Sequence, residues 1–261
     1  MIPRIVPFVD HEIGYRILEK LISYVDAGKI EIPVVVTTRE NGVAWWPSVD
    51  QLCARADIQL LIYEEQIYEN SWLQNTDWFL LLSWKHVIPV NLINVPKQGV
   101  LNLHYSLLPD LRGVYPVNWA IINGLDVTGV SYHLVNEDID SGEVLIQTPV
   151  EILLNDTART LQARMDDVAY DSFDKLLEQL VWHPSLTGIQ QSVSQHNTSE
   201  NYYSRTKFEI ACEIDLNKSY KGKEIYDLLR GLTFFPDSKN AYVLDHTTGK
   251  KIYISFTFIE D

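Results

Sequence analysis

The sequence contains little cysteine, and this scarcity restricts what the protein can be. Cys53 and Cys212 are the only cysteines among 261 residues. Two cysteines are too few for a disulfide framework or for a four-cysteine zinc site. We therefore expect a reducing compartment and no structural metal.

Long apolar runs are absent as well. The first twelve residues hold a short apolar stretch that prolines at positions 3 and 7 interrupt and that Asp10 ends. A secretory signal needs an unbroken hydrophobic run, and a membrane-spanning helix needs about 20 apolar residues. We expect a soluble, cytoplasmic protein without a membrane partner.

Positive charge is also scarce. Lys and Arg total 21 against 35 Asp and Glu, which gives a formal net charge of −14. Proteins that bind nucleic acid need a basic surface that displaces counterions from phosphates. Bulk nucleic acid is therefore a poor candidate partner, whereas a small phosphorylated ligand, which one or two well-placed cations can hold, is not excluded.

Short apolar runs alternate with amphipathic stretches over the first part of the chain. Apolar residues recur at helical spacing from Ile13 to Val25, and compact apolar runs precede and follow them. The pattern predicts strands at 5–9, 30–36, 58–63, 78–84 and 100–105 and helices at 13–25 and 64–73. It is typical of an α/β fold with a mostly parallel, Rossmann-like sheet flanked by helices.

A long helix is predicted to be the last element of the main domain. Two strands and then this amphipathic helix are expected at 127–135, 142–152 and 157–181. Asn155 and Asp156 precede the helix and are candidates for its N-terminal cap. A polar stretch from 183 to about 200 is typical of a linker. We therefore assign residues 1–200 to the main domain.

Residues 201–261 are predicted to form a small, β-rich C-terminal unit. Its expected elements are a strand at 208–214, a helix at 222–232 and a hairpin of strands at 241–245 and 251–259. The last strand has an apolar face that a two-stranded hairpin cannot bury by itself. The hairpin must therefore pack on the main domain or on another subunit.

Asn102 and His104 are the first candidate functional residues. They lie two positions apart in an expected strand, so their side chains share one face. Open α/β sheets bind ligands at the carboxyl ends of their strands. A single Asn or His at such a place is more often structural. The loop that follows adds Arg112, which suits a charged ligand, and Gly113, which allows close backbone approach.

Asp140 is the third candidate, followed by Ser141 and Gly142. Such a sequence is by itself an ordinary turn. A calcium loop starting at Asp138 would need Asp or Asn where Gly142 stands and Glu where Pro149 stands, which excludes calcium. The motifs of serine hydrolases, P-loop enzymes and zinc peptidases are absent, and no glycosidase pair can be singled out among the acidic residues.

Together these residues resemble the signature of the folate-dependent formyltransferase family. The matching residues are Asn102, Leu103, His104, the run Ser106–Pro109, Arg112, Gly113, Pro116 and the run Asp140–Gly142. The resemblance is strong over residues 80–150 and extends over the rest of the first 180 residues by the order of elements. It implies that residues 1–200 are a catalytic domain for formyl transfer.

Within this family the chain resembles the branch that formylates nucleotide-linked amino sugars. The loop 112–116 resembles both the tRNA and the sugar enzymes, and Asn118 with Trp119 resembles the sugar branch. Further segments similar to the short C-terminal unit of sugar N-formyltransferases are 201–205, 228–236 and 240–242. A tRNA enzyme should carry a basic C-terminal domain, whereas residues 206–261 hold eight Lys and Arg against nine Asp and Glu.

The resemblance implies that a formyl group passes from 10-formyltetrahydrofolate to the amino group of a nucleotide-linked sugar. The first candidate substrate is dTDP-4-amino-4,6-dideoxyglucose, ahead of the 3-amino isomer and GDP-perosamine, in the synthesis of O-antigen or a related surface glycan. A homodimer through the terminal hairpin is expected at the level of the family. A 10-formyltetrahydrofolate hydrolase and a non-catalytic binding protein are the competing interpretations.

The resemblance also implies catalytic roles. Asn102 would hydrogen-bond the oxyanion, and His104 would bind the same oxygen or accept the amine proton. Asp140 would orient His104 and relay protons through water. These roles are exchangeable among the three residues.

Binding residues follow from the same resemblance. The pterin ring of the folate is expected between the backbone of Val87, Ile88 and Pro89 and that of the loop containing Glu137 and Asp138. The candidates for the sugar nucleotide are Lys85, Tyr105, Arg112, Gly113 and Tyr203. No metal is implied. We expect His86, His133 and His183 to be structural.

Overall fold

The computed structural model of the chain describes residues 2–38, 47–64, 67–182, 202–234 and 240–254. The chain divides into two compact units. Unit 1 consists of Met1–His104, Ser131–Gln147 and Ala169–Gln191, and unit 2 of Tyr105–Val130, Thr148–Val168 and Ser192–Asp261. Each unit is therefore built from segments that lie far apart in the sequence.

The described residues contain a seven-stranded sheet with the strand order β3-β2-β1-β4-β5-β7-β8. The strands are β1 (Ile5–Val9), β2 (Val35–Thr37), β3 (Leu60–Ile62), β4 (Trp78–Leu82), β5 (Gly99–His104), β7 (Val127–Leu134) and β8 (Val144–Glu151). β1 pairs in parallel with β2 and β4, β2 with β3, and β4 with β5. β7 runs antiparallel to β5. The mostly parallel, Rossmann-like sheet predicted from the sequence is confirmed.

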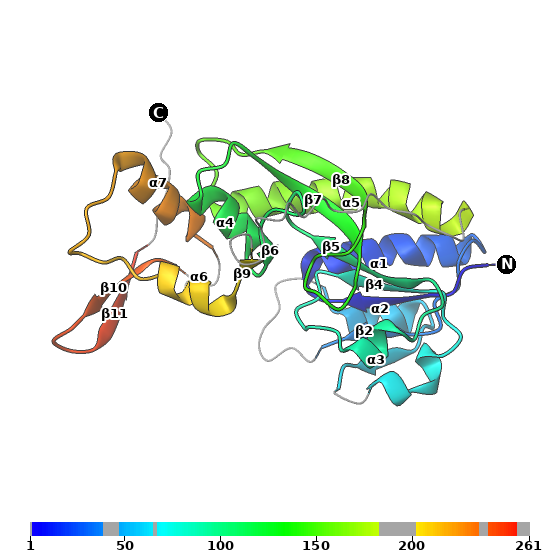
Figure 1. Cartoon of the computed structure of the whole chain (residues 1–261). Coiled ribbons are helices and arrows are strands. Elements are labelled where there is room, and N and C mark those ends of the chain that lie inside the picture. Colours follow the sequence, from blue (N-terminus) through cyan, green and yellow to red (C-terminus); the bar gives the residue numbers. More distant parts are fainter. Residues whose placement is uncertain (1, 39–46, 65–66, 183–201, 235–239, 255–261) are drawn as a thin grey trace. The chain divides into compact units, whose positions relative to one another are not determined.

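Helices cover both faces of this sheet. α1 (His11–Asp26) and α5 (Ala158–Trp182) lie on one face, and α2 (Val49–Arg55) and α3 (Val90–Ile93) lie on the other (Figure 1). The inward side of α1 is apolar, because Ile17, Leu18 and Leu21 are fully buried. On the opposite face of the sheet, Phe79 and Leu92 belong to one buried cluster. The helices on both faces therefore bury an apolar core. This core holds the strands, and with them the strand ends, in place.

The prediction of a helix at 64–73 is wrong. Two short 3-10 helices, η1 (Ile67–Glu69) and η2 (Ser71–Leu73), stand in its place, and residues 65–66 lie outside the described residues. The side chain of Asn70 accepts a hydrogen bond from the backbone N–H of Trp72 at 2.9 Å. Asn competes with the helical ladder through such local bonds, and here it begins a new turn instead of continuing a helix.

In unit 2, α4 (Pro116–Ile122) packs closely on α7 (Gly222–Gly231), the helix predicted at 222–232. Gly231 permits the close approach, since a Cβ there would lie 2.7 Å from Cγ1 of Ile122. The side-chain amide of Asn118 donates to the carbonyl oxygen of Gly231 at 2.8 Å. Packing and this buried hydrogen bond together hold α7 on α4.

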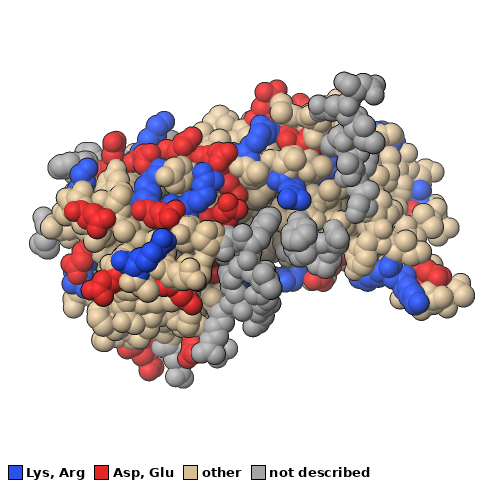
Figure 2. All heavy atoms as spheres, turned by 180° about the vertical axis from the view of Figure 1, so that it is seen from behind, with Lys and Arg blue, Asp and Glu red and all other residues tan. Residues whose placement is uncertain are grey.

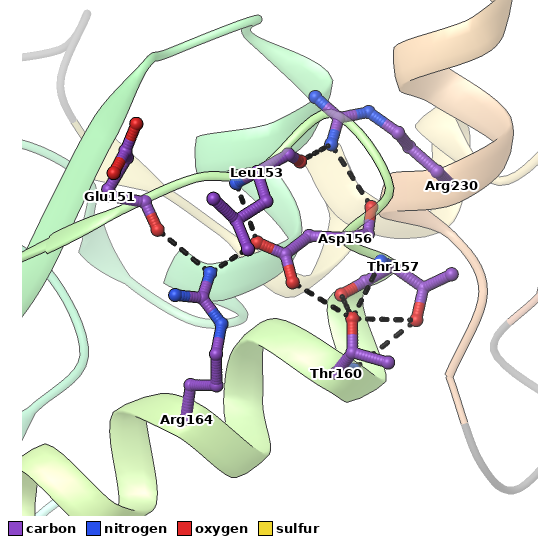
Figure 3. A network of polar contacts seen from close by, with 7 residues as sticks. All are labelled: Glu151, Leu153, Asp156, Thr157, Thr160, Arg164 and Arg230. Atoms are coloured by element: carbon purple, nitrogen blue, oxygen red, sulfur yellow. Dashed lines mark hydrogen bonds and ion pairs between the residues drawn. The ribbon is translucent and has the colours of Figure 1, made fainter.

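A polar network also ties α7 to the segment that joins β8 to α5 (Figure 3). Arg230 is buried, and its Nη1 donates to the carbonyl oxygens of Leu153 at 2.9 Å and Asp156 at 3.0 Å. Its charge is paired with the carboxylate of Asp227, 2.8 Å away. Because buried charges need both an ion pair and hydrogen bonds, this network explains how an arginine is accommodated there.

The start of α5 is capped by threonines. Thr157 Oγ1 accepts the backbone N–H of Thr160 at 3.3 Å, which is the geometry of an N-terminal cap. Of the two caps predicted from the sequence, Asp156 takes part by accepting the hydroxyl of Thr160 at 3.1 Å (Figure 3). The cap is therefore Thr157, one residue after Asp156.

The strand predicted at 208–214 is wrong, because residues Arg205–Ala211 form the helix α6. Phe208 and Cys212 are buried, whereas Ile210 is 71% exposed. Residues four apart share a helix face, so the burial follows a helical period although the apolar residues also alternate as in a strand. The alternation of apolar residues therefore predicts a strand where the structure has a helix.

The C-terminal hairpin is present as predicted. β10 (Tyr242–Asp245) pairs antiparallel with β11 (Lys250–Tyr253). In the turn, Asp245 accepts the backbone N–H of Thr247 at 2.9 Å. β11 ends at Tyr253, whereas residues 255–259 of the predicted last strand and the linker predicted at 183–200 lie outside the described residues.

Charge is mixed on one face of the molecule. On the face drawn in Figure 2, the basic side chains of the described residues lie among acidic ones. No helix among the described residues is both long and apolar enough to cross a bilayer.

Candidate functional site

The strand β5 presents two polar side chains near its carboxyl end in unit 1. Asn102 is partly exposed and His104 is 5% exposed. β5 pairs with β4 on one edge and with β7 on the other, so its backbone is held on both sides. The two side chains share a face because they are two positions apart. A rigid strand therefore fixes the amide and the imidazole next to each other.

The loop that follows β7 brings Asp140 to the same place. Asp140 has φ of +50°, a left-handed conformation that Asp tolerates better than most residues. The Ser141 hydroxyl lies 2.8 Å from the side-chain oxygen of Asn136, which braces the loop. A Cβ at Gly142 would overlap the carbonyl oxygen of Leu134, so the loop can return onto β7 only with glycine there.

These side chains form one cluster. Oδ1 of Asp140 lies 3.5 Å from Nδ2 of Asn102, and its Oδ2 lies 3.6 Å from Nδ1 of His104. The same carboxylate lies 3.6 Å from Nε2 of His133, a residue expected from the sequence to be structural. The three side chains predicted to be catalytic are thus brought together, and a fourth joins them.

The cluster contains the groups that acyl transfer to an amine requires. An amide N–H can stabilise negative charge on a carbonyl oxygen, and an imidazole can accept a proton. At 3.6 Å the Asp140 carboxylate is beyond ordinary hydrogen-bond distance from His104, but close enough to stabilise the ring as a cation. The set is suited to attack by an amine on a carbonyl carbon.

A second polar group of unit 1 lies where β1 and β4 end. Asp10 is 6% exposed and accepts the hydroxyl of Thr38 at 2.7 Å. Nζ of Lys85 lies 3.8 Å from Oδ1 of Asp10. Lys85, predicted to contact a sugar diphosphate, is therefore anchored at its inner side and half exposed.

A family model described as formyl transferase matches residues 27–177, which is more than half of the chain. The chain belongs to the formyl transferase family. A second model, described as the N-formyltransferase dimerization C-terminal domain, matches residues 207–260. The family relation inferred from the residues around Asn102 and Asp140 is confirmed.

Curated relatives in the formyl transferase family include methionyl-tRNA formyltransferases. The one from Clostridioides difficile is 30% identical over 168 residues, which cover 64% of this chain and 52% of the relative. The one from Fusobacterium nucleatum is 31% identical over 183 residues, which cover 68% of this chain and 56% of the relative. The chain spans about half the length of these relatives.

Solved structures of formyl transferases share the fold over 90% to 100% of the chain. A sugar N-formyltransferase from a Shewanella species has a TM-score of 0.77 at 23% identity, covering 100% of both chains. A 4-N formyltransferase from Francisella tularensis has a TM-score of 0.78 at 22% identity, covering 100% of this chain and 99% of that one. An N-formyltransferase from Helicobacter canadensis, solved with folinic acid and dTDP-3-aminofucose, has a TM-score of 0.68 at 22% identity and covers 90% of this chain and 81% of that one.

The segments predicted to hold the folate are also in unit 1. Val87 is 75% exposed, Ile88 is buried in the core cluster and Pro89 is exposed. Glu137 and Asp138 are both exposed. Ile88 thus anchors its segment, while the residues on either side of it are exposed.

Four predicted sugar-nucleotide residues lie in unit 2. Arg112 and Gly113 form β6, which pairs in parallel with β9 (Tyr202–Tyr203). Gly113 has φ of +99°, and a Cβ there would overlap the carbonyl oxygen of Tyr203. Tyr105 is buried, and its hydroxyl donates to Asp166 at 2.5 Å. The structure brings Arg112, Gly113 and Tyr203 together, whereas the hydroxyl of Tyr105 is hydrogen-bonded to a side chain of α5.

The rings of unit 2 further define the place of Tyr203. Its ring lies 4.6 Å from that of Trp119, and Nζ of Lys207 lies 3.9 Å from the centre of the Tyr203 ring. Its hydroxyl accepts the side-chain amide of Asn123 at 2.7 Å. Tyr203 is therefore held in a fixed orientation by ring contacts and by a hydrogen bond.

Two residues of unit 1 were not predicted from the sequence. His133 is opposite Asn102 in the β5–β7 register, and Asp10 is the anchor of Lys85. The sequence shows a His two positions after Ser131, but the pairing register that sets it beside Asn102 is not visible in the spacing. In the sequence Asp10 only ends an apolar stretch, and nothing in the spacing links it to Lys85.

Proposed function

We propose that the protein is an N-formyltransferase that moves a formyl group from 10-formyltetrahydrofolate to the amino group of a nucleotide-linked sugar. The observation that carries the proposal is the cluster of Asn102, His104 and Asp140 on the strand and loop ends of unit 1. Membership in the formyl transferase family supports it. An amide donor, an imidazole and a carboxylate at one place suit acyl transfer to an amine.

The amine attacks the formyl carbon as a neutral nucleophile. Asn102 donates an N–H to the formyl oxygen as negative charge develops there, and His104 accepts the proton that the nitrogen loses. Asp140 stabilises the ring of His104 while it carries that proton. The bond from the formyl carbon to the folate nitrogen then breaks, and that nitrogen takes up a proton. The products are an N-formyl sugar and tetrahydrofolate.

The sugar branch is supported over the tRNA branch by three observations. The C-terminal match is to a dimerization domain of N-formyltransferases. The structures that cover the whole chain include a sugar N-formyltransferase and a 4-N formyltransferase. Residues 206–261 hold eight Lys and Arg against nine Asp and Glu. A segment with this charge balance binds a polyanion such as tRNA poorly.

In this proposal the organisation of the chain follows its function. Residues 1–200 form the catalytic part, and residues 201–261 pair two subunits through the β10–β11 hairpin. The backbone of 87–89 and of 137–138 holds the pterin ring. The sugar nucleotide is held by Lys85, Tyr105, Arg112, Gly113 and Tyr203.

The substrate we place first is dTDP-4-amino-4,6-dideoxyglucose, made for a surface glycan such as O-antigen. Its amine is at position 4 of the sugar, and the Francisella tularensis structure is that of a 4-N formyltransferase. The 3-amino isomer comes second, because the Helicobacter canadensis enzyme was solved with dTDP-3-aminofucose. GDP-perosamine is third. We expect the enzyme to act in the cytoplasm.

The test is a formyl-transfer assay with purified protein and 10-formyltetrahydrofolate. Each of the three nucleotide sugars and methionyl-tRNA is offered separately, and the product mass is measured. We expect one sugar to gain a formyl group at a rate that depends on enzyme concentration. Formylation of methionyl-tRNA alone would overturn the sugar assignment. Release of formate without any acceptor would favour the hydrolase.

A further inference from the structure

His133 is a fourth polar side chain of the cluster, and it has no role in the mechanism above. It lies on β7 directly opposite Asn102 and is 1% exposed. Its ring centre is 6.2 Å from that of His104, at an angle of 85° between the ring planes. A histidine that is both fully buried and beside two reacting groups must have its hydrogen bonds satisfied there.

One of these hydrogen bonds fixes the tautomer of the ring. Nδ1 of His133 lies 2.8 Å from the carbonyl oxygen of Leu134. A carbonyl oxygen only accepts, so Nδ1 must carry the hydrogen. A neutral imidazole has a single N–H, which leaves Nε2 with a bare lone pair.

The second hydrogen bond uses that lone pair. Nδ2 of Asn102 lies 3.1 Å from Nε2 of His133. An amide nitrogen only donates, so Nε2 accepts, as the tautomer deduced from Leu134 requires. A protonated ring would set two donors against each other at this distance. The two contacts therefore agree on a neutral ring with its hydrogen on Nδ1.

This arrangement also prevents a flip of the Asn102 amide that would exchange its oxygen and nitrogen. With the amide reversed, its oxygen would face the lone pair of Nε2, and two acceptors would oppose each other. In the observed orientation the second hydrogen of Nδ2 faces Asp140, whose Oδ1 is 3.5 Å away. A contact of that length is weak, so this hydrogen can be given to a stronger acceptor.

We propose that His133 is a positioning residue that holds the amide of Asn102 with one N–H directed at the reacting oxygen. The inference rests on the proposed function for the identity of that oxygen. The titratable groups that face His133 in the cluster are Asp140 from the loop and His104 from β5. His133 acts through Asn102 and touches neither substrate in this mechanism.

The tautomer is tested without any catalytic assay. The protein is labelled with ¹⁵N in its histidines, and long-range ¹H–¹⁵N spectra are recorded at neutral pH, with the His133 signals assigned by their loss in His133→Gln. We expect a protonated Nδ1 and a bare Nε2. A hydrogen on Nε2, alone or together with one on Nδ1, would overturn the proposal. This result is independent of which acceptor is formylated.

The action through Asn102 is tested by a double-mutant cycle. His133→Phe keeps a ring of similar size but removes the acceptor, and we expect kcat to fall by about tenfold to a hundredfold with KM little changed. In an Asn102→Ala background the same change should have almost no further effect on kcat. His133→Gln, which offers a carbonyl oxygen as acceptor, should recover part of the loss.

Tyr132→Phe is the matched control on the same strand. Tyr132 is equally buried and donates to the carbonyl oxygen of Ala169, in unit 1 but away from Asn102. If Tyr132→Phe lowers kcat at all, the double variant with Asn102→Ala should show the product of the two separate fold-losses. If the losses of His133→Phe and Asn102→Ala also multiply, His133 acts independently of the amide and the proposal is wrong. Should His133→Phe fail to fold, His133→Gln and the spectra still decide.

Discussion

Oδ2 of Asp140 lies 3.6 Å from Nδ1 of His104, close enough for the carboxylate to favour a positive charge on the ring but too far for an ordinary hydrogen bond. The two residues come from different elements, a strand and a loop with a left-handed residue. The distance depends on how the loop returns onto β7. The charge state of His104 during transfer therefore depends on the geometry of this loop.

Asp140→Asn tests that dependence. The substitution keeps the shape of the side chain but removes its charge, so the ring of His104 loses the group that stabilises it as a cation. We expect kcat to fall by about a hundredfold or more, with stability little changed. Steady-state kinetics with the preferred sugar measure the effect. Asp174→Asn is the control, because this carboxylate is paired with Lys20 at the surface and its loss should leave kcat at the wild-type value.

Gly142→Ala should damage the same site through the backbone. A methyl group at this position would overlap the carbonyl oxygen of Leu134. The same oxygen accepts the hydrogen bond from Nδ1 of His133. We expect a loss of about 1–3 kcal/mol in the free energy of unfolding and a fall in kcat. Denaturant unfolding and kinetics measure the two effects. For comparison, a Cβ at Gly222 would meet nothing within 4 Å, so Gly222→Ala should be neutral.

Much of the fold could be predicted because hydrophobic periodicity decides it locally. β1 (Ile5–Val9) and α7 (Gly222–Gly231) stand where their patterns indicated. α6 could not be predicted in this way, since Phe208, Ile210 and Cys212 fit both a strand and a helix period. Only the tertiary burial of Phe208 and Cys212, with Ile210 exposed, separates the two.

The candidate site was predictable in part. Asn102 and His104 share a strand face by simple alternation, and Asp140 was expected near them only through the family resemblance. His133 was missed because its place depends on the antiparallel register of β7 against β5, in which Asn102 and His133 are partners. A one-residue shift in register would turn its side chain to the other face of the sheet.

Lys85→Met tests the proposed diphosphate contact. Nζ of Lys85 is 3.8 Å from Asp10, whose other interactions hold it in place, so removal of the ammonium takes away a fixed positive charge. We expect KM for the nucleotide sugar to rise by about tenfold, with KM for the folate unchanged. Lys97→Met is the matched control, because Lys97 has a similar contact with Asp77, at 3.9 Å, before the start of β5. An equal rise in KM for both variants would contradict a specific contact of Lys85.

Cys53 should make the fold sensitive to alkali. Burial, reinforced by the nearby Asp50 carboxylate, raises the pKa of Cys53 from 9.0 to about 11. Below pH 9.0 the thiol is protonated in both the folded and unfolded states, and its contribution to stability is fully present. As the pH rises from 9.0 towards about 11, the unfolded chain ionises first, so stability is lost across this range. Urea unfolding at several pH values should show this decline, and Cys53→Ala should make it less steep between pH 9 and 10. An identical slope in the variant would mean that the buried thiol does not contribute to it. Tyr132, whose pKa burial raises well above 10.0, adds a further decline above pH 10 in both proteins.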